Sequence, residues 1–486
     1  MNDRGFIEQE SAAKAAEESQ LNKPITLSLL LTFGLPTIFA LLVMNTFTIV
    51  DGVFAMRRLG AEAMAAVSVV TPFAIIVIAI GIMFALGGSA LVAKKSGMGL
   101  KQEARQNFTL LCIVALVVSS LVAAFAAIFP ETLLELLGAN YEIMELATTY
   151  LRIFALSIPL VTVSQVFNQF LIADGKPMLG MGVSLLGSSL SAGLNAIFLF
   201  GLDMGIEGLA LASLIGYSVT SLIGFLCFVR NKKGTLYFVR PGFDIGAIGV
   251  ASLNGFGAFV NTVVAAVVTI VMNNVLVRMD GVGAMGVAVA GMVMGVHATL
   301  ASVFFGYLSG ISPLISYNYG NRNHDRQKKL FKYNLRIIAI ISLIALGGAL
   351  ALSDLLIRIY VPAGTELHAM AVRGLRIAAM SFLMFGFNAF AVSHFSALNK
   401  GLIAGVLSTV RTLGLNLPLL LVLPRFFDLT GVWAATPISE VLALTLSTLF
   451  LLVMGKRYHY LGKGSNKNNI KIMAEYENLK NEEQNL

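Results

Sequence analysis

The sequence predicts an all-α polytopic membrane protein with twelve transmembrane helices, arranged as two six-helix lobes. The prediction rests on the composition, on a series of apolar stretches separated by short charged loops, and on an internal repeat. Of the 486 residues, 57% are hydrophobic and only 12% are charged, whereas soluble domains contain about 45–50% apolar and 25% charged residues. Soluble helix bundles of this length need charged outer faces, and this chain lacks them.

Twelve stretches are long and apolar enough to cross a bilayer, at roughly 20 residues for each crossing. In chain order they are 25–56, 63–93, 106–130, 144–171, 178–202, 206–229, 246–278, 284–313, 332–353, 370–398, 401–423 and 430–455. The mixed charges of residues 1–23 do not form the basic region of a cleavable signal peptide. We therefore expect the first stretch to act as its own insertion signal.

Alternate loops are basic, and this predicts the orientation of the chain. The loops after the second, sixth and eighth stretches hold Lys94, Lys95, Lys101, Arg105, Arg230, Lys232, Lys233, Arg240, Arg322, Arg326, Lys328, Lys329 and Lys332. The positive-inside rule places these loops and both termini in the cytoplasm. Residues 1–24 are expected to be a cytoplasmic segment and 456–486 a polar cytoplasmic tail.

An internal repeat divides the membrane region. Residues 151–157 (LRIFALS) recur as 375–381 (LRIAAMS), an offset of 224, and residues 208–213 recur as 431–436, an offset of 223. The residues Gly87, Ser89, Leu91 and Gly97 match Gly310, Ser312, Leu314 and Gly320, again at 223. We expect an N-lobe (25–229) and a C-lobe (246–455), joined by a linker (230–245). Lobes related by a pseudo-two-fold axis along the membrane normal are typical of carriers.

The carboxylate of Asp51, near the outer end of the first stretch, is the main candidate for a functional group. A carboxylate within a span is costly, so it indicates function by default, and apolar surroundings favour a carboxyl that binds and releases protons. Thr48 can share its face, and Asn45 lies nearby. Pro36 permits a kink in the same helix. The alternative is that Asp51 caps the outer loop in water.

Polar side chains at helical spacing follow three further stretches. They are Ser184, Ser188, Ser191 and Asn195; Thr162, Gln165, Asn168 and Gln169; and Thr262, Thr269 and Asn273. Each stripe faces either a neighbouring helix, as hydrogen-bonding glue, or a wet cavity. Several stripes around one carboxylate favour a cavity in the N-lobe.

The C-lobe contains its own titratable candidates. Glu440 follows Pro437 and is either a second titratable site or a residue at a helix end. Arg411 is an intramembrane cation that needs a partner, for which structural pairing is favoured over substrate contact. His297 and His394 relay protons or are neutral, hydrogen-bonded packing residues.

Enzymatic and metal-binding motifs are absent from the sequence. It contains no G-x-x-x-x-G-K-[ST], H-E-x-x-H or G-x-S-x-G pattern and no Cys/His metal spacing. Its two cysteines, Cys112 and Cys227, are expected to be packing residues. We therefore expect no enzyme, no cofactor and no metal, and transport that depends on an ion gradient or a separate subunit. The net charge of +8 is explained by the loops rather than by nucleic-acid binding.

Three motifs resemble one transporter family. They are Val50-Asp51-Gly52-Val53-Phe54 followed by LGAEAMAAV at 59–67 and Pro72; GISPLISYNYG at 310–320; and Arg411 through Pro418 followed by GVWAATPI at 431–438. From about residue 25 to 455 the chain resembles the multidrug and toxic compound extrusion (MATE) transporters, in particular the bacterial MepA-like branch.

The resemblance implies a V-shaped cavity between two six-helix lobes and export of organic, often cationic compounds in exchange for protons or sodium. In the family, the aspartate matching Asp51 forms an N-lobe cation site with an asparagine matching Asn195. Two positions depart from the pattern: Leu199 replaces the second carboxylate of N-x-x-L-D-P, and Ile172 replaces an arginine. Because a hard cation needs several oxygen ligands, we expect coupling to protons rather than sodium.

Alternative functions remain at this stage. A flippase for lipid-linked oligosaccharides, from a related branch, would need an extended basic cavity, and Arg411 is one of few central cations. A membrane-embedded enzyme is disfavoured by the missing motifs, and Leu199 keeps a non-transporting subunit open. The expected partners are small cationic organic molecules and the lipid bilayer, with the chain a monomer.

Overall fold

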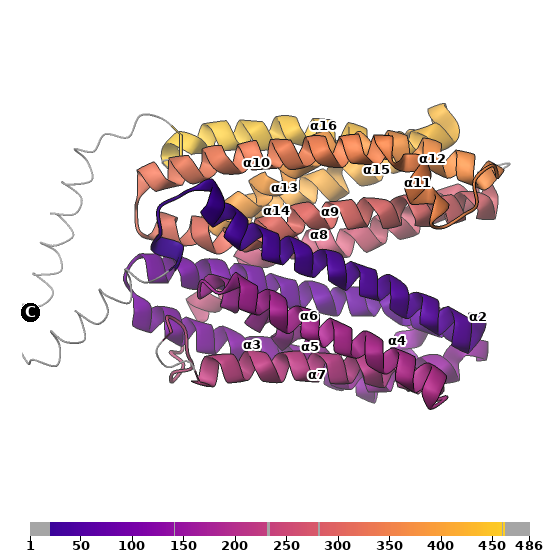
Figure 1. Cartoon of the computed structure of the whole chain (residues 1–486), viewed down its shortest axis with the longest axis horizontal. Coiled ribbons are helices and arrows are strands. Elements are labelled where there is room, and N and C mark those ends of the chain that lie inside the picture. Colours follow the sequence, from indigo (N-terminus) through magenta and orange to yellow (C-terminus); the bar gives the residue numbers. More distant parts are fainter. Residues whose placement is uncertain (1–19, 140, 231–233, 280–281, 459, 462–486) are drawn as a thin grey trace, which may run out of the picture.

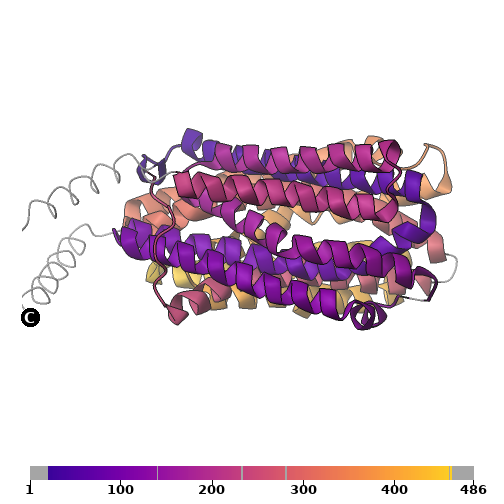
Figure 2. The same cartoon turned by 90° about the horizontal axis from the view of Figure 1, so that it is seen from below.

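The computed structural model describes residues 20–139, 141–230, 234–279, 282–458 and 460–461. Over these ranges the chain is built from helices and their connections, without β-strands. The long helices run side by side along the longest axis of the molecule (Figure 1, Figure 2). We call the end at which the described chain begins and ends the terminal end. The opposite end, where the short helices α4 (Pro130–Leu136) and α11 (Ser353–Arg358) lie, is the distal end (Figure 1).

Two sets of helices form the two lobes. The first set comprises η1 (Gln20–Asn22), α2 (Leu27–Gly97), α3 (Lys101–Ile128), α4 (Pro130–Leu136), α5 (Tyr141–Ala173), α6 (Pro177–Ala196), the π-helix η2 (Ile197–Gly201) and α7 (Gly205–Arg230). The second comprises α8 (Ile245–Val277), α9 (Gly283–Gly320), α10 (His324–Ala351), α11 (Ser353–Arg358), α12 (Glu366–Ala379), α13 (Phe382–Ala397), α14 (Gly401–Thr409), the π-helix η3 (Val410–Asn416), α15 (Leu417–Val422) and α16 (Pro424–Arg457).

The described helices account for the twelve predicted spans. Eleven are long and apolar enough to cross a membrane, and α12 and α13, bent by 48° at a short break, make a twelfth. Helix α2 supplies the first two spans, because Gly60 interrupts it at φ +80°, a conformation that glycine adopts without strain. The fold class predicted from the sequence is therefore confirmed.

The first half of α2 crosses from one lobe to the other. Leu30 and Phe33 are fully buried in the same apolar core as Phe304 and Tyr307 of the C-lobe helix α9. From there α2, indigo in Figure 1, runs diagonally to the N-lobe helices at the distal end. This helix therefore connects the C-lobe core mechanically to the site around Asp51.

Glycines of the internal repeat form the contact between the lobes. A Cβ atom on Gly97 would overlap the carbonyl oxygen of Tyr317, and one on Gly320 would overlap that of Lys94. The contact is reciprocal because Gly97 and Gly320 are repeat partners. Gly87 packs in the same way on Ala251 of α8. Small residues allow helix backbones this close in lipid, and the pairing follows the predicted pseudo-two-fold axis.

The lobes are also joined by hydrogen bonds near the terminal end. Thr37 Oγ1 donates to the carbonyl oxygen of Gly306 at 2.7 Å. Ser309 Oγ donates to Gln169 Oε1 at 2.8 Å, and Gln169 Nε2 donates to the Ser309 carbonyl oxygen at 3.1 Å. Together with the glycine contacts, these bonds seal the terminal end between the lobes.

Candidate functional site

Asp51 and Asn195 meet near the distal end of the N-lobe. Asn195 Nδ2 donates a hydrogen bond to Asp51 Oδ1 at 2.8 Å. Asn195 is fully buried, whereas Asp51 is half-buried. The Oδ1 atom of Asn195 is buried without a hydrogen-bond partner among the described residues. The structure thus brings together the two residues that the family resemblance paired, and leaves one acceptor beside them unsatisfied.

A widened helical turn follows Asn195. Helix α6 passes into the π-helix η2, and such bulges occur frequently at functional sites. Arg58 of α2 binds this turn: its Nε donates to the carbonyl oxygen of Leu199 at 3.1 Å, and its Nη2 pairs with Asp203 at 2.8 Å. The side chain of Leu199 is fully buried. Arg58 therefore holds the end of α6 against α2, close to Asp51.

Two tyrosines complete the surroundings of Asp51. Tyr150 of α5 and Tyr217 of α7 lie close enough to Asp51 for an electrostatic interaction between each hydroxyl group and the carboxylate. Four helices, α2, α5, α6 and α7, thus converge on this carboxylate. The sequence analysis did not identify either tyrosine or Arg58 as a site residue. A tyrosine in a span or an arginine in a loop is not distinctive in the sequence, and only the packing of the helices brings these residues near Asp51.

The other predicted N-lobe residues lie elsewhere. Asn168 donates to Ser184 Oγ between α5 and α6, and the Gln165 amide lies over Gly81. Asn168 is eighteen residues beyond Tyr150 on α5, about 27 Å at 1.5 Å per residue. Ser191 contacts Gly216 of α7. The structure places these groups as contacts between helices.

The structure describes two of the three other site residues predicted in α2, Asn45 and Pro36, but not the side chain of Thr48. Asn45 is half-buried. Pro36 lies inside α2 without a departure from helical φ and ψ, so the proline does not break the helix in this state. It lines an apolar groove of about 680 Å³ beside Met178 and Met181 of α6.

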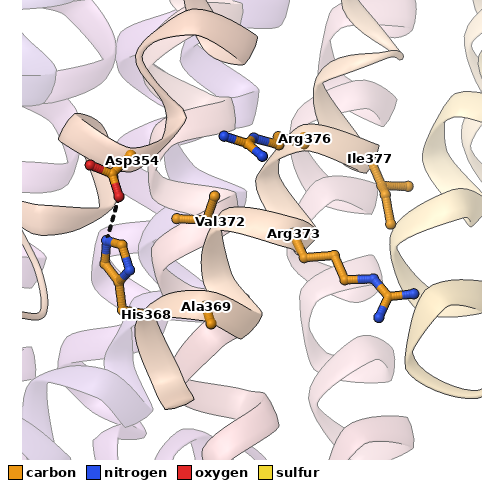
Figure 3. Close-up of a pocket in the computed structure, with 7 residues that line it drawn as sticks. All are labelled: Asp354, His368, Ala369, Val372, Arg373, Arg376 and Ile377. Carbon is orange, nitrogen blue, oxygen red and sulfur yellow. Dashed lines mark ion pairs between the residues drawn. The ribbon is translucent and has the colours of Figure 1, made fainter. Parts of the chain in front are cut away.

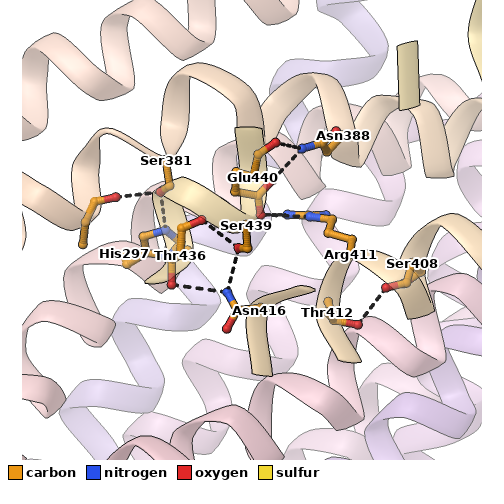
Figure 4. A network of polar contacts seen from close by, with 11 residues as sticks. His297, Ser381, Asn388, Ser408, Arg411, Thr412, Asn416, Thr436, Ser439 and Glu440 are labelled. Atoms are coloured by element: carbon orange, nitrogen blue, oxygen red, sulfur yellow. Dashed lines mark hydrogen bonds and ion pairs between the residues drawn. The ribbon is translucent and has the colours of Figure 1, made fainter. Parts of the chain in front are cut away.

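A buried ion pair is the centre of the C-lobe site (Figure 4). Arg411 Nη2 and Nε approach Glu440 Oε1 at 2.8 and 2.9 Å, and Asn388 Nδ2 donates to Glu440 Oε2 at 2.7 Å. The guanidinium carbon lies 4.6 Å from the ring centre of Phe385. Both charged side chains are buried, with exposures of 7% and 5%. The structural pairing favoured for Arg411 is therefore present, and both Glu440 oxygens are occupied.

A second π-helix carries the arginine of this pair. Arg411 lies in η3, and Asn416 at its end donates to Ser439 Oγ at 3.1 Å. Asn273 is half-buried near the distal end of α8, and the hydrogen bonds of the described residues do not connect it to Arg411 or Glu440. Asn388 and Phe385 were missed in the sequence because an amide and a ring among many apolar residues are not distinctive.

The two candidate histidines have different surroundings. His297 Nε2 is 3.1 Å from Ser381 Oγ, and its ring stacks on Phe382 with centres 4.6 Å apart. His394 is buried without a hydrogen-bond partner for either nitrogen within the described part of the chain. Its ring centre lies 4.7 Å from that of Tyr460. His297 is thus a hydrogen-bonded histidine, whereas His394 is enclosed by aromatic rings near the terminal end.

Comparison with known proteins places this geometry in a family. The MatE family model matches residues 36–197 and 258–422, one segment in each lobe. The multidrug export protein MepA of Staphylococcus saprophyticus is 24% identical over 397 residues, covering 81% of this chain and 86% of its own length. That of Staphylococcus haemolyticus is 24% identical over 444 residues, covering 91% and 95%.

A solved structure agrees with the arrangement of the helices. The outward-facing conformation of a multidrug resistance MATE family transporter superposes with a TM-score of 0.84 at 19% identity, covering 92% of this chain and 98% of that one. The relatives are export proteins, which confirms the expectation of a carrier rather than an enzyme. Because the family model matches more than half of the chain, this protein belongs to the MATE family and to its MepA-like branch.

Proposed function

We propose that this protein is a secondary active multidrug exporter that exchanges organic cations for protons across the inner membrane of a bacterium. Both termini lie in the cytoplasm in this proposal, as the basic loops indicate, and the chain works as a monomer. The MepA relatives, which are named multidrug export proteins, support export of varied small molecules. The chemistry of Asp51 supports the cationic substrate and the proton.

The observation that carries the proposal is that Asp51 has no fixed cationic partner in the described part of the chain. Among the described residues its hydrogen-bond donor is the neutral amide of Asn195, and the ion pairs do not include it. A carboxylate within the membrane is costly unless it is neutralised. A proton and an organic cation can each neutralise Asp51, so each displaces the other, and this competition is the basis of exchange.

The seal between the lobes gives the exchange a direction. Contacts such as that between Gly97 and Tyr317 join the lobes at the terminal end, which is cytoplasmic in the proposed orientation. This state is therefore closed to the cytoplasm, and Asp51 receives protons from outside while the substrate leaves. A change of charge at Asp51 then shifts helix α2, whose other end is packed in the C-lobe core around Phe33. This shift favours opening or closing of the contacts between the lobes at the terminal end.

The ligands around Asp51 favour a proton over sodium. A hard cation takes several oxygen ligands, usually with more than one carboxylate. At the position of the family's second carboxylate stands Leu199, whose carbonyl oxygen already accepts a hydrogen bond from Arg58. The flippase alternative loses support as well, because Glu440 neutralises the central cation Arg411.

Transport of ethidium, a fluorescent organic cation, into inverted membrane vesicles tests this function. We expect an imposed proton gradient to drive uptake, a sodium gradient alone to leave it unchanged, and Asp51→Asn to reduce it to the level of vesicles without the protein. Glu135→Gln, at an exposed carboxylate of α4, is the matched control and retains uptake. Uptake by Asp51→Asn at the wild-type rate, with equal protein in the membrane, would contradict the proposal.

A further inference from the structure

A pocket of about 450 Å³ lies at the distal rim of the C-lobe, and its lining includes neither Asp51 nor the Arg411–Glu440 pair. It lies where α11 meets α12, the first half of the bent span (Figure 3). Its polar lining residues are Asp354, His368, Arg373 and Arg376. Neither the transport proposal nor the inter-lobe contacts use this pocket.

The pocket carries unpaired positive charge. Arg376 Nε donates to Ser353 Oγ at 2.9 Å, and Arg373 Nη2 reaches Thr430 Oγ1 at 3.4 Å. Neither guanidinium has a carboxylate within ion-pair distance in the described part of the chain. The one carboxylate of the lining, Asp354, is already paired with Arg358 at 2.6 Å. The lining therefore retains the charge of two arginines.

His368 supplies a buried polar atom in the same pocket. Its side chain is 8% exposed, and its Nε2 has no hydrogen bond within the described residues. Asp354 Oδ1 lies 3.4 Å from that nitrogen and forms an ion pair with it when His368 is protonated, as the dashed line in Figure 3 marks. Figure 3 shows Arg376 extending toward Asp354 and His368, whereas Arg373 extends away from them. Arg376 and His368 thus form the inner part of the site, and Arg373 forms its edge.

The helix that supplies Asp354 also carries exposed apolar side chains, which indicate the source of the ligand. Leu355 of α11 is 59% exposed and Ile359, directly after this helix, is 75% exposed. Exposed apolar groups next to unpaired arginines at the end of a membrane span fit a molecule with a phosphate and acyl chains. Guanidinium groups bind phosphate oxygens with strong, charge-assisted hydrogen bonds.

We propose that this rim pocket binds the phosphate of an anionic phospholipid headgroup from the adjoining leaflet. Arg376 and His368 donate to the phosphate oxygens, Arg373 adds charge at the edge, and the acyl chains lie against Leu355 and Ile359. The ligand is recognised by its phosphate, a chemistry that a free inorganic phosphate ion shares. The proposal does not depend on which substrate the protein exports.

Native mass spectrometry of the full-length protein in detergent tests the proposal, with phosphatidylglycerol, phosphatidylcholine and inorganic phosphate added separately. We expect phosphatidylglycerol to bind more tightly than phosphatidylcholine. We expect Arg373→Gln/Arg376→Gln to weaken this binding by about 10-fold or more, because each lost charge-assisted hydrogen bond corresponds to roughly a tenfold change. Arg152→Gln is the matched control, since Arg152 is the repeat counterpart of Arg376 in the N-lobe.

Three outcomes would overturn the proposal. Equal binding of the two lipids removes the charge selectivity, and unchanged phosphatidylglycerol binding in the double variant removes the site. Inorganic phosphate that binds as tightly as phosphatidylglycerol and displaces it assigns the pocket to a free anion rather than to lipid. His368→Ala serves as a second variant with a smaller change of charge, and we expect weaker phosphatidylglycerol binding with an unchanged melting temperature in lipid-free detergent.

Discussion

The two lobes each place a carboxylate beside a π-helical turn, but they neutralise it differently. In the N-lobe, Asp51 is half-buried and is bonded to the neutral amide of Asn195. In the C-lobe, Glu440 is almost fully buried and shares one oxygen with two nitrogens of Arg411. Asn195 lies just before the π-helix η2, whereas Asn416 is the last residue of the π-helix η3. The lobes thus share a framework and differ in where the cation comes from.

This difference suggests a division of labour. The C-lobe carboxylate has a built-in cation, so an exported molecule or a proton must displace a guanidinium to reach it. Among the described residues the N-lobe carboxylate has no such cation, as the proposed exchange requires. A buried ion pair stabilises little beyond what a well-packed apolar pair provides, yet loss of one partner is strongly destabilising. We therefore infer that the C-lobe pair fixes structure while Asp51 exchanges ions.

The largest expected effect comes from breaking the C-lobe pair. Arg411→Leu leaves Glu440 buried without its cation, and we expect a loss of about 3–5 kcal/mol in the free energy of unfolding. Arg411→Leu/Glu440→Leu removes both charges and should recover most of that loss. Thermal melting of the purified protein in detergent measures both variants. A single variant as stable as the wild type would show that the pair does not hold the C-lobe together.

The next effect concerns the amide of the N-lobe. Asn195→Ala removes the described hydrogen-bond donor to Asp51, a bond to a charged group that corresponds to about 1.5–3 kcal/mol. We expect ethidium export to fall by roughly 10-fold or more, with protein levels unchanged. Ser188→Ala, on the same helix α6, is the control and should export normally. Equal export by the two variants would contradict a role for Asn195 in setting the charge of Asp51.

The smallest effect concerns a carboxylate outside the spans. Asp174 pairs with Lys176 at 2.5 Å and accepts a hydrogen bond from the Leu236 backbone N–H at 2.8 Å. Burial raises the pKa of Asp174, although Lys176 opposes the shift. The folded state therefore holds this proton more tightly than the unfolded state, so protonation adds stability at low pH that is lost as the pH rises through the raised pKa.

Asp174→Asn removes that pH dependence and keeps an oxygen that can accept from Leu236 N–H. We expect a change of less than about 1 kcal/mol at neutral pH. The variant should also show a flatter melting temperature than the wild type between about pH 4 and about pH 7. Melting curves over this range measure it. A variant that lost several kcal/mol would show that the charge, rather than the hydrogen bond, holds the linker.

Much of the fold could be predicted because the signals are periodic or repeated. The apolar stretches indicate the spans, and the match of Gly97 with Gly320 indicates the repeat; the reciprocal contact of these glycines at the seal is seen only in the structure. The pair of Asp51 and Asn195 came from family resemblance, because residues 144 positions apart carry no sign of contact in a single sequence.

The rest depends on how the helices rotate and pack. Gln165 and Asn168 lie on polar stripes, but periodicity does not distinguish a face toward a neighbouring helix from a face toward a cavity. Arg58, which the sequence places in a loop, donates a hydrogen bond to the π-helical turn at Leu199. The two residues lie far apart in the chain, so the contact appears only when α2 and α6 pack together. The structure was also needed to identify Glu440 as the partner of Arg411. The sequence indicated only that an arginine within a span needs a partner.

Proton release on substrate binding tests most directly whether Asp51 is the exchangeable carboxylate. Ethidium is added to the purified protein in weakly buffered detergent solution, and the released protons are counted with a pH indicator. We predict about one proton for each bound cation in the wild type, and none in Asp51→Asn. Release from Asp51→Asn equal to that of the wild type would place the exchange at another group and contradict the account.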